Sequence, residues 1–526
     1  AGDLYTTNGE SLDWNSNAFL YYTRSFNKQH NLNVSAGWEA ASGTTESTNA
    51  HYRGFPSGEF HSLNYAAEVY KKPTRTENTT RRVSVLASAN YTWNDIYLVD
   101  ASVRFDGSSE FGANQKWAPF FSGGLGVNIH NYDFFKSNGY INKLKLRASY
   151  GRTGKVNFPA YAATTMYETL FDEWYITGYG AVLKALGNKD LTWEKTDKLS
   201  VGIETKTFHD RLTVDFEYYY NKTIDLVNDV TLSQTSGFST YKDNMGQVAN
   251  KGVELKLRAD IYRDRNWNVA LWGNMAHNKN EILKISDSQK AYNERVAAYY
   301  KNEALYQETL GLSHGAEYSV PLPQYEEGAS LTSIWAVRSL GIDPTTGKEI
   351  FLNRDGSIAD KWNAAQEVVV GNTEPKCSGA FGLNLSYKNW TLFASFLYEW
   401  GGQEYNQTLV NNVENADLVN KNVDLRVLTD RWKKPGDIAQ FKDIKDRGMT
   451  TLPTSRFVQD KALVRLNSLN VSYDFNRDWI KKHLRMNLLR LEAYTSDLIN
   501  WSSIKQERGL SYPRSWKVEF SLKAQF

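Results

Sequence analysis

The last twelve residues, SWKVEFSLKAQF (residues 515–526), alternate strictly between polar and apolar side chains. The apolar series begins at Trp516 and takes every second position to Phe526. Alternate residues of a β-strand face opposite sides, so this period of two predicts a strand with one apolar and one polar face. A strand at the end of a chain is usually an exposed edge. What covers this apolar face therefore depends on whether the rest of the chain repeats the pattern.

The same alternation recurs along the whole chain, and we count about fifteen such strands. Apolar side chains alternate with polar or charged ones for about ten residues each time, the length that a tilted strand needs to cross a bilayer. The clearest examples are residues 81–94, 142–151, 197–206, 211–221, 251–262 and 389–401.

The composition is compatible with strands that cross a membrane. The 526 residues carry a net charge of +2, which favours neither nucleic acid nor an acidic partner. Mean hydropathy is −0.56, and no apolar run approaches the roughly eighteen residues of a membrane-spanning helix. A transmembrane barrel keeps a low average because lipid-facing and lumen-facing residues alternate. The single cysteine, Cys377, excludes an internal disulfide.

The connections between the predicted strands alternate between short and long. Short ones follow Phe26, Trp93, Phe208, Tyr262 and Tyr387. Long ones are expected at about 42–80, 152–195, 222–248, 278–375 and 402–461. Barrels of the bacterial outer membrane have short periplasmic turns and long extracellular loops. The sequence therefore predicts an all-β, antiparallel transmembrane β-barrel with extracellular long loops and a periplasmic C-terminus.

Aromatic residues mark the ends of many apolar strand faces, where a girdle at the two membrane interfaces would fall. The members of this predicted girdle are Trp93, Tyr150, Trp390, Trp400 and Trp516. Core packing is the alternative for any single one of them. We also expect the last strand to close the barrel by pairing with the first strand, which would leave it without an open edge.

Several stretches resemble the SusC/RagA family of TonB-dependent outer-membrane transporters, which is typical of Bacteroidetes. The first runs from Val99 to Ile129 and contains the Arg-Phe-Asp-Gly-Ser-Ser turn of residues 104–109; later ones include RWKKPGD (431–437) and residues 454–475. The matches follow the family order over nearly the whole chain, whereas residues 488–516 diverge from it. In addition, Phe520, Leu522 and Phe526 resemble the C-terminal signature by which outer-membrane proteins engage the barrel-assembly machinery.

The resemblance implies a barrel of twenty-two strands around an N-terminal plug. Because about fifteen strands and no plug are found here, we expect this chain to be the C-terminal part of such a barrel. The resemblance also implies a SusD-like surface lipoprotein as partner, the TonB complex acting through the missing N-terminal and plug region, and outer-membrane lipid around the strands. The implied function is active import of a nutrient, with an oligosaccharide favoured and a peptide possible.

No motif of a known catalytic class, cofactor site or metal site is found, so we expect neither an enzyme nor a metalloprotein. Residues 343–356 are interpreted as a hairpin, and 291–308 have helix-like spacing and are expected to contact a partner. Aromatic rings stack on sugars, and carboxylates accept hydrogen bonds from hydroxyls. The predicted ligand-binding residues are therefore Phe171, Asp172, Trp174, Tyr175 and Tyr179, although these aromatics could equally pack the loop against its neighbours or the lipoprotein.

A different class of protein remains open at this point. A soluble or cell-surface all-β module that binds glycans or acts as an adhesin would also use alternating strands. It would pack the apolar strand faces on one another and dissolve without detergent.

Overall fold

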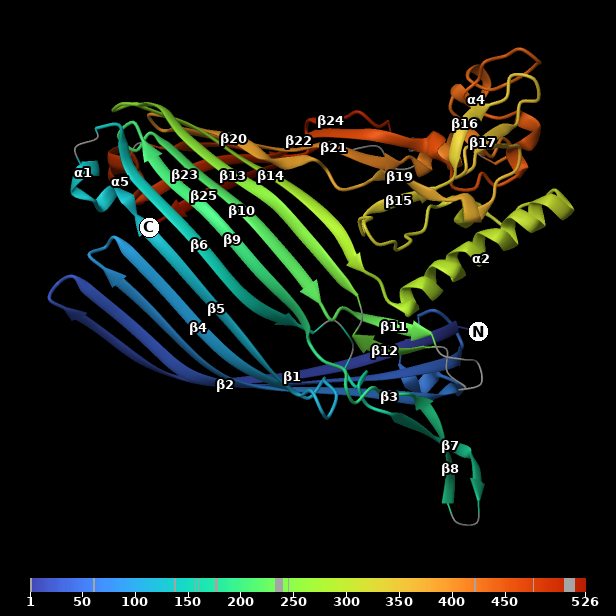
Figure 1. Cartoon of the computed structure of the whole chain (residues 1–526), viewed down its shortest axis with the longest axis horizontal. Helices are drawn as coiled ribbons and strands as arrows, with labels where there is room; N and C mark the ends of the chain where they lie inside the picture. Colours follow the sequence, from blue (N-terminus) through green and yellow to red (C-terminus); the bar gives the residue numbers. More distant parts are fainter. Residues whose placement is uncertain are drawn as a thin grey trace. The chain divides into compact units, whose positions relative to one another are not determined.

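Alternating sequence produces one large antiparallel sheet in the computed structural model (Figure 1). The structure describes residues 2–59, 62–136, 139–156, 158, 160–175, 178–231, 240–244, 246–420, 422–475, 477–505 and 516–526. Fifteen strands follow one another along the sheet, and a sixteenth, β24 (Asn500–Ser502), pairs with β22. In order they are β1 (Gly2–Phe26), β2 (His30–Phe55), β3 (Glu68–Trp93), β4 (Tyr97–Ser108), β5 (Trp117–Asn128), β6 (Ile141–Lys155), β9 (Glu194–Thr207), β10 (Leu212–Ile224), β13 (Gln247–Arg263), β14 (Trp267–Lys284), β20 (Cys377–Tyr387), β21 (Trp390–Tyr405), β22 (Val458–Asp474), β23 (Leu488–Ser496) and β25 (Lys517–Gln525). The predicted all-β class and strand number are confirmed.

The chain divides into two compact units, which we describe separately. Unit 1 comprises residues 1–126, 149–198 and 223–246. Unit 2 comprises residues 127–148, 199–222 and 247–526. Strands β6, β9 and β10 each contribute residues to both units.

The short connections lie where the sequence places them, with turn chemistry that fits. Between β3 and β4 only residues 94–96 intervene, and Asn94 and Asp95 adopt φ of 54° and 56°. Asn and Asp tolerate this left-handed region better than most residues, and tight hairpin turns require it. Two connections of intermediate length, residues 129–140 and 475–487, contain the helices α1 (Asp133–Lys136) and α5 (Arg477–Leu484).

The prediction of a long loop at 42–80 is wrong. Strands β2 and β3 continue through most of it, and the connection is residues 56–67. The register holds through polar pairs such as Thr44 with Thr79 and Glu46 with Glu77, and the two threonine hydroxyls lie 3.1 Å apart. This part of the hairpin is polar on both faces, so it lacks the apolar alternation by which strands were recognised, although threonine favours β-structure.

The other long connections lie close to the expected positions in the chain, and they have structure of their own. Residues 152–195 include the hairpin β7 (Met166–Tyr175) and β8 (Gly178–Ala185), and 222–248 include β11 (Val227–Thr231) and β12 (Thr240–Asn244). Strand β14 ends at Lys284, β21 ends at Tyr405 and β22 begins at Val458, so the last two connections are shorter than expected. The ends of strands that extend beyond a membrane need not alternate, which explains these boundary errors.

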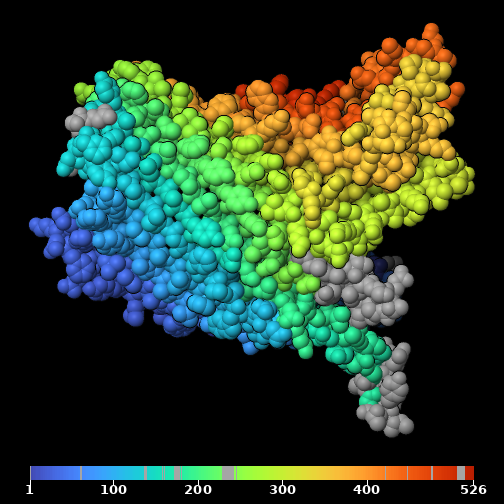
Figure 2. All heavy atoms as spheres, viewed as in Figure 1, coloured from blue at the N-terminus to red at the C-terminus, as the bar shows by residue number. Residues whose placement is uncertain are grey.

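The two last long connections of unit 2, residues 285–376 and 406–457, form a packed body that we call the loop layer (Figure 2). Its helix α2 (Asp287–Leu310) confirms the helical expectation for 291–308 and begins with a capping box between Ser286 and Gln289. The remaining helices are α3 (Gln407–Leu409) and α4 (Arg426–Thr429), and the small strands are β15 (Ser333–Ala336), β16 (Arg338–Ile342), β17 (Glu349–Leu352), β18 (Ile358–Ala359) and β19 (Val368–Asn372). Antiparallel pairing of β16, β17 and β18 confirms the hairpin interpretation of 343–356.

Apolar clusters stabilise the loops of each unit. In unit 1, Phe111, Phe120, Leu191 and Trp193 belong to one buried cluster. In the loop layer, one cluster surrounds Phe441 and Phe457, and another surrounds Tyr300, a buried residue of α2. Among the helices of the described residues, none combines the length and the hydropathy that crossing a membrane requires.

The expectation that the last strand pairs with the first is wrong for this chain. Strand β25 is hydrogen-bonded to β23, and among the described residues no ladder joins β25 to β1. In a sheet of fifteen successive antiparallel strands, the first and the fifteenth run in the same direction and cannot form an antiparallel ladder.

Candidate functional site

The two faces of the sheet have opposite chemistry. In unit 2 the Arg147 guanidinium contacts the carboxylates of Asp215 at 2.9 Å and Glu217 at 2.6 Å. Lys143 contacts Glu204 at 2.6 Å on the same face. The opposite face carries side chains such as Leu255 and Leu257 of β13. Ion pairs across strands thus line one face, which we call the charged face, and the other is the apolar face.

Unit 1 repeats this division. Arg104 of β4 contacts Glu39 of β2 at 2.8 Å and Asp106 at 2.6 Å, and donates a hydrogen bond to the buried hydroxyl of Ser84. The neighbouring Val83 and Val85 of β3 face the other way and are exposed.

A polar cavity of about 490 Å³ lies on the charged face of unit 1. Its polar lining residues are Asp13 and Asn15 of β1, Ser42 of β2, Thr80, Arg81 and Arg82 of β3, and Glu110. Register places them together, because Asp13 pairs with Gly43, which pairs with Thr80. A Cβ at Gly43 would lie 2.5 Å from Asp13 Oδ1, so a larger side chain there would displace the Asp13 carboxylate.

A second cavity of about 250 Å³ shares Arg81 and Glu110 with the first and includes Tyr161. The Tyr161 hydroxyl accepts a hydrogen bond from the Thr79 backbone N–H at 3.0 Å, which ties the loop before β7 to β3. The polar surface therefore continues from the strands towards the loops of unit 1.

The cavity offers hydrogen-bond donors and acceptors of both charges. Within the described residues Arg82 has no ion-pair partner, while the Asp13 carboxylate accepts a hydrogen bond from Ser11 Oγ at 3.1 Å. Such a set suits a ligand rich in hydroxyls or one with both ammonium and carboxylate groups. In the part of the chain that the structure describes, no group of three or more His, Cys, Asp or Glu could hold a metal ion.

The loop layer of unit 2 contains a buried charge network. Arg456 Nη2 lies 2.9 Å from Glu349 Oε2 and 2.7 Å from Glu414 Oε1, and the Glu414 side chain is fully buried. Burial opposes the charge of Arg456, but the two carboxylates outweigh it and raise the pKa of the guanidinium. Burial would also raise the pKa of Glu349, but the charge and hydrogen bonds of Arg456 hold it below its ordinary value. The network therefore joins β17, the segment after β21 and the segment just before β22.

A second buried carboxyl, that of Glu367, forms no ion pair with the residues that the structure describes. Its Oε2 accepts a hydrogen bond from the Gln324 amide, and its Oε1 has no partner among the described residues. Burial raises the pKa of Glu367 to about 8, although the Gln324 hydrogen bond and the Arg354 charge act in the opposite direction. The folded loop layer thus holds a proton on Glu367 that an unfolded chain would release near pH 4.5.

This carboxyl predicts how the stability of the loop layer depends on pH. Above its ordinary pKa the unfolded chain loses the proton while the folded chain keeps it, so stability falls as pH rises from about 4.5 to about 8, by about 3–5 kcal/mol. Replacing Glu367 with glutamine should remove this dependence. Hydrogen–deuterium exchange of residues 352–372 at pH 5 and pH 8, corrected for intrinsic rates, measures it. Glu327→Gln, an exposed carboxyl, is the control, and equal pH dependence of wild type and Glu367→Gln would contradict the prediction.

The structure leaves the predicted ligand-binding residues untested. The backbones of Phe171, Asp172, Trp174 and Tyr175 belong to β7, and that of Tyr179 belongs to β8, where Trp174 pairs with Tyr179. Their side chains lie outside the described residues. The described residues that line the two cavities of unit 1 do not include any of them.

The predicted interface and assembly residues are all exposed, as contact with lipid or another protein requires, but this does not identify what covers them. They are Trp93, Tyr150, Trp390, Trp400, Trp516, Phe520, Leu522 and Phe526. Their roles stay predictions.

Sequence reasoning missed the cavity residues and the buried network. Asp13 and Arg82 were not singled out because charged residues on alternating strands are common, and residues 42–80 were treated as a loop. The pairing of Asp13 with Gly43 and Thr80 depends on strand register, which the sequence did not provide. The partners of Arg456 lie 42 and 107 residues away, and no local signal joins them.

The two-faced antiparallel sheet fits a transmembrane β-barrel, and comparison with known proteins identifies its family. The chain belongs to the family described as TonB dependent receptor-like, beta-barrel, which matches residues 2–494. This family comprises outer-membrane transport proteins and not enzymes, as expected from the sequence. The alternative of a soluble β module is thereby contradicted.

Individual relatives narrow the class to barrels of the SusC/RagA type. TonB-dependent receptor P39 of Formosa agariphila is 26% identical over 98% of this chain and 53% of its own length. TonB-dependent receptor SusC of Bacteroides thetaiotaomicron is 29% identical over 46% of this chain and 25% of its own length. The RagAB peptide importer in its open-open state superposes with a TM-score of 0.83 at 22% identity, over 100% of this chain and 56% of that one. The chain spans about half the length of P39, and the resemblance to the SusC/RagA family is confirmed.

Proposed function

We propose that this chain forms barrel strands of an importer that takes up a nutrient across the outer membrane, with an oligosaccharide favoured and a peptide as the alternative substrate. The observation that carries the proposal is the two-faced sheet: ion pairs line one face, and the other is apolar. In a barrel this arrangement gives a polar interior and a lipid-facing exterior.

The orientation and the partners belong to the same proposal. The long connections face the outside and the C-terminus faces the periplasm, because barrels place short turns on the periplasmic side. A SusD-like lipoprotein covers the loops, the TonB complex supplies energy through a plug outside this sequence, and the barrel-assembly machinery recognises Phe520, Leu522 and Phe526. Similarity to SusC, and to RagAB, which is described as a peptide importer, supports these assignments and leaves both substrate classes open.

The polar cavity of unit 1 supplies the substrate contacts in this proposal. Arg82 offers five N–H donors, and Asp13 and Glu110 offer acceptors, a combination that sugar hydroxyls and peptide termini can both satisfy. In this proposal the rings of Phe171, Trp174, Tyr175 and Tyr179 would add stacking on a substrate, and Asp172 would accept hydrogen bonds from its hydroxyls.

Arg82→Ala and Asp13→Ala should each reduce uptake by about 10- to 100-fold, because each removes charge-assisted hydrogen bonds worth roughly 1.5–3 kcal/mol. The measurement is uptake of labelled oligosaccharides and peptides by cells that carry the complete protein, with and without the proton-motive force. Arg24→Ala is the control, since this exposed arginine of β1 does not line the cavity. Normal uptake by both cavity variants would show that the cavity does not contact substrate, and energy-independent uptake would contradict the importer itself.

A further inference from the structure

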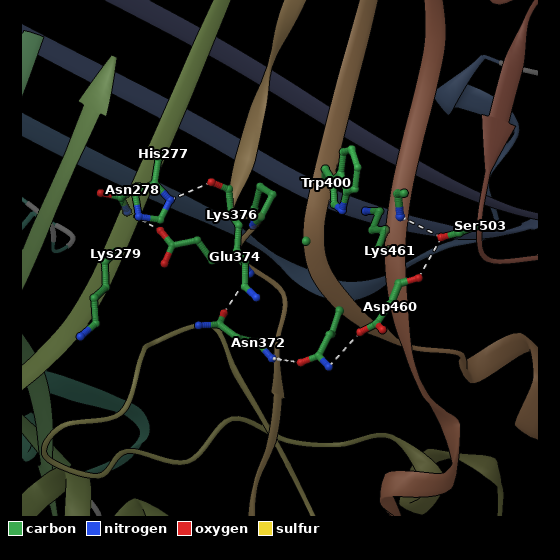
Figure 3. Close-up of a pocket in the computed structure, with 14 residues that line it drawn as sticks. His277, Asn278, Lys279, Asn372, Glu374, Lys376, Trp400, Asp460, Lys461 and Ser503 are labelled. Atoms are coloured by element: carbon green, nitrogen blue, oxygen red, sulfur yellow. Dashed lines mark hydrogen bonds between the residues drawn. The ribbon is translucent and has the colours of Figure 1, made fainter. Parts of the chain in front are cut away.

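Unit 2 contains a crevice where β14, β21 and β22 meet the segment before β20, which belongs to the loop layer (Figure 3). His277 of β14 pairs with Val253, and Trp400 of β21 pairs with Ala462, so both side chains belong to the apolar face. The crevice has a volume of about 520 Å³. Its basic lining residues are His277, Lys279, Lys376 and Lys461.

A second cavity of about 400 Å³ adjoins the crevice and shares Trp400 and Ala462 with it. Its other apolar walls are Phe381, Tyr398, Val464 and Trp501. Two of its aromatic rings, those of Phe381 and Tyr398, lie with centroids 6.1 Å apart. Because the two cavities share walls, one elongated molecule with a polar and an apolar end can occupy both.

The acidic groups of the crevice are already satisfied. Glu374 accepts hydrogen bonds from the Asn278 amide and, at 3.0 Å, from the Asn280 backbone N–H. The Asp460 carboxylate accepts one from Gln403 Nε2 at 3.1 Å. Their hydrogen bonds screen the two negative charges only in part. Binding of an anion therefore requires that its attraction to the lysines exceed its repulsion by Glu374 and Asp460.

The basic groups are not all satisfied. Lys461 lies 3.3 Å from Glu399 and 3.4 Å from Glu404, and Lys279 lies 3.4 Å from Glu281. Lys376 is exposed and has no ion pair among the described residues. His277 Nδ1 donates to the Lys376 carbonyl oxygen at 2.7 Å, which fixes the ring beside this lysine. The crevice, which adjoins the apolar groove through Trp400 and Ala462, therefore presents an ammonium group without an ion pair among the described residues.

We propose that the crevice and the groove together bind one phosphorylated glycolipid of the outer leaflet. An acyl chain would occupy the groove of Phe381, Tyr398 and Trp501, and a sugar phosphate would contact Lys376, with Lys279 nearby. A bare phosphate would not fill the polar crevice, whereas a phosphorylated sugar could use Asn372, Gln403 and Ser503 as hydroxyl partners. This inference rests on the proposed function, because it requires the apolar face to meet lipid and the loops to face outside.

The test measures lipid bound to the purified full chain rather than uptake. Folded protein in detergent is stripped of lipid and then titrated by native mass spectrometry with bis-phosphorylated lipid A and, separately, with phosphatidylglycerol. We expect one tightly bound lipid A and at least tenfold weaker phosphatidylglycerol binding. Lys376→Gln should weaken lipid A about tenfold, and Trp400→Ala should weaken both lipids.

Lys388→Gln is the matched control, since it removes a lysine beyond the other end of the strand that Lys376 precedes. The inference would be overturned if Lys376→Gln bound lipid A as wild type does, if the two lipids bound equally, or if the stripped wild-type protein bound no added lipid A. If Lys376→Gln no longer shows the electrophoretic mobility of a folded barrel, Lys376→Arg is measured in its place and should keep lipid A binding. Uptake is measured separately, so intact uptake without lipid binding overturns this inference and leaves the importer standing.

Discussion

Replacing Arg456 with methionine is expected to destabilise the loop layer by about 3–5 kcal/mol, the usual cost of removing one member of a buried ion pair. Methionine keeps much of the apolar volume of the arginine side chain but leaves the carboxylates of Glu349 and Glu414 without their cation. Both carboxylates are too buried for water to take its place. Thermal unfolding of the folded chain in detergent, with hydrogen–deuterium exchange of residues 406–457, measures the loss.

Two further variants make the Arg456 result specific. Arg338→Met removes an exposed arginine from β16 of the same layer and should change the free energy of unfolding by less than about 0.5 kcal/mol. Adding Glu349→Gln and Glu414→Gln to Arg456→Met removes the uncompensated charges and should restore much of the lost stability. Wild-type exchange in Arg456→Met would mean that the network adds nothing to the stability of the layer.

Placing a lysine at Leu255 should prevent assembly into the outer membrane. Leu255 lies in the middle of β13 on the apolar face, where it pairs with Met275 of β14. A lysine that faces lipid near the middle of the bilayer costs about 2–4 kcal/mol. The fraction of protein in the outer-membrane pellet, and the heat-modifiable electrophoretic mobility of a folded barrel, report the outcome.

The adjacent residue provides the control for this experiment. Glu254→Lys introduces the same side chain one position away, on the charged face of the same strand. We expect Glu254→Lys to assemble at near wild-type level while Leu255→Lys does not. Equal assembly of both variants would show that the apolar face does not meet lipid, and the proposed orientation of the sheet would be wrong.

Most of the sheet could be predicted from the sequence, because each strand carries its own signal. Segments 81–94 and 251–262 show the period of two locally, and the turn at Asn94 and Asp95 has residues that tolerate positive φ. Helix α2 was likewise predictable, since its capping box and helical spacing lie within one stretch. The loop at 42–80 was mispredicted because its strands are polar on both faces, so local hydropathy gives no strand signal there.

The candidate site could not be predicted in the same way. Asp13 and Arg82 line the same cavity only because β1, β2 and β3 adopt one register. A shift of a strand by one residue would turn its side chain to the apolar face. The walls of the crevice in unit 2 come from β14, β19, β21 and β22 and the segment before β20, and Lys376 lies next to Cys377, which pairs with Trp400.

By itself, the sequence determined the class of the fold, the alternation of faces and the order of strands and loops, because hydropathy period and turn chemistry are properties of neighbouring residues. Only the tertiary structure decided which charges are paired, which cavities exist and which cations stay free. These depend on strand register and on contacts such as that of Arg456 with Glu349, 107 residues away. The strength of such an ion pair depends on how deeply the fold buries it, and segments distant in the sequence decide that burial.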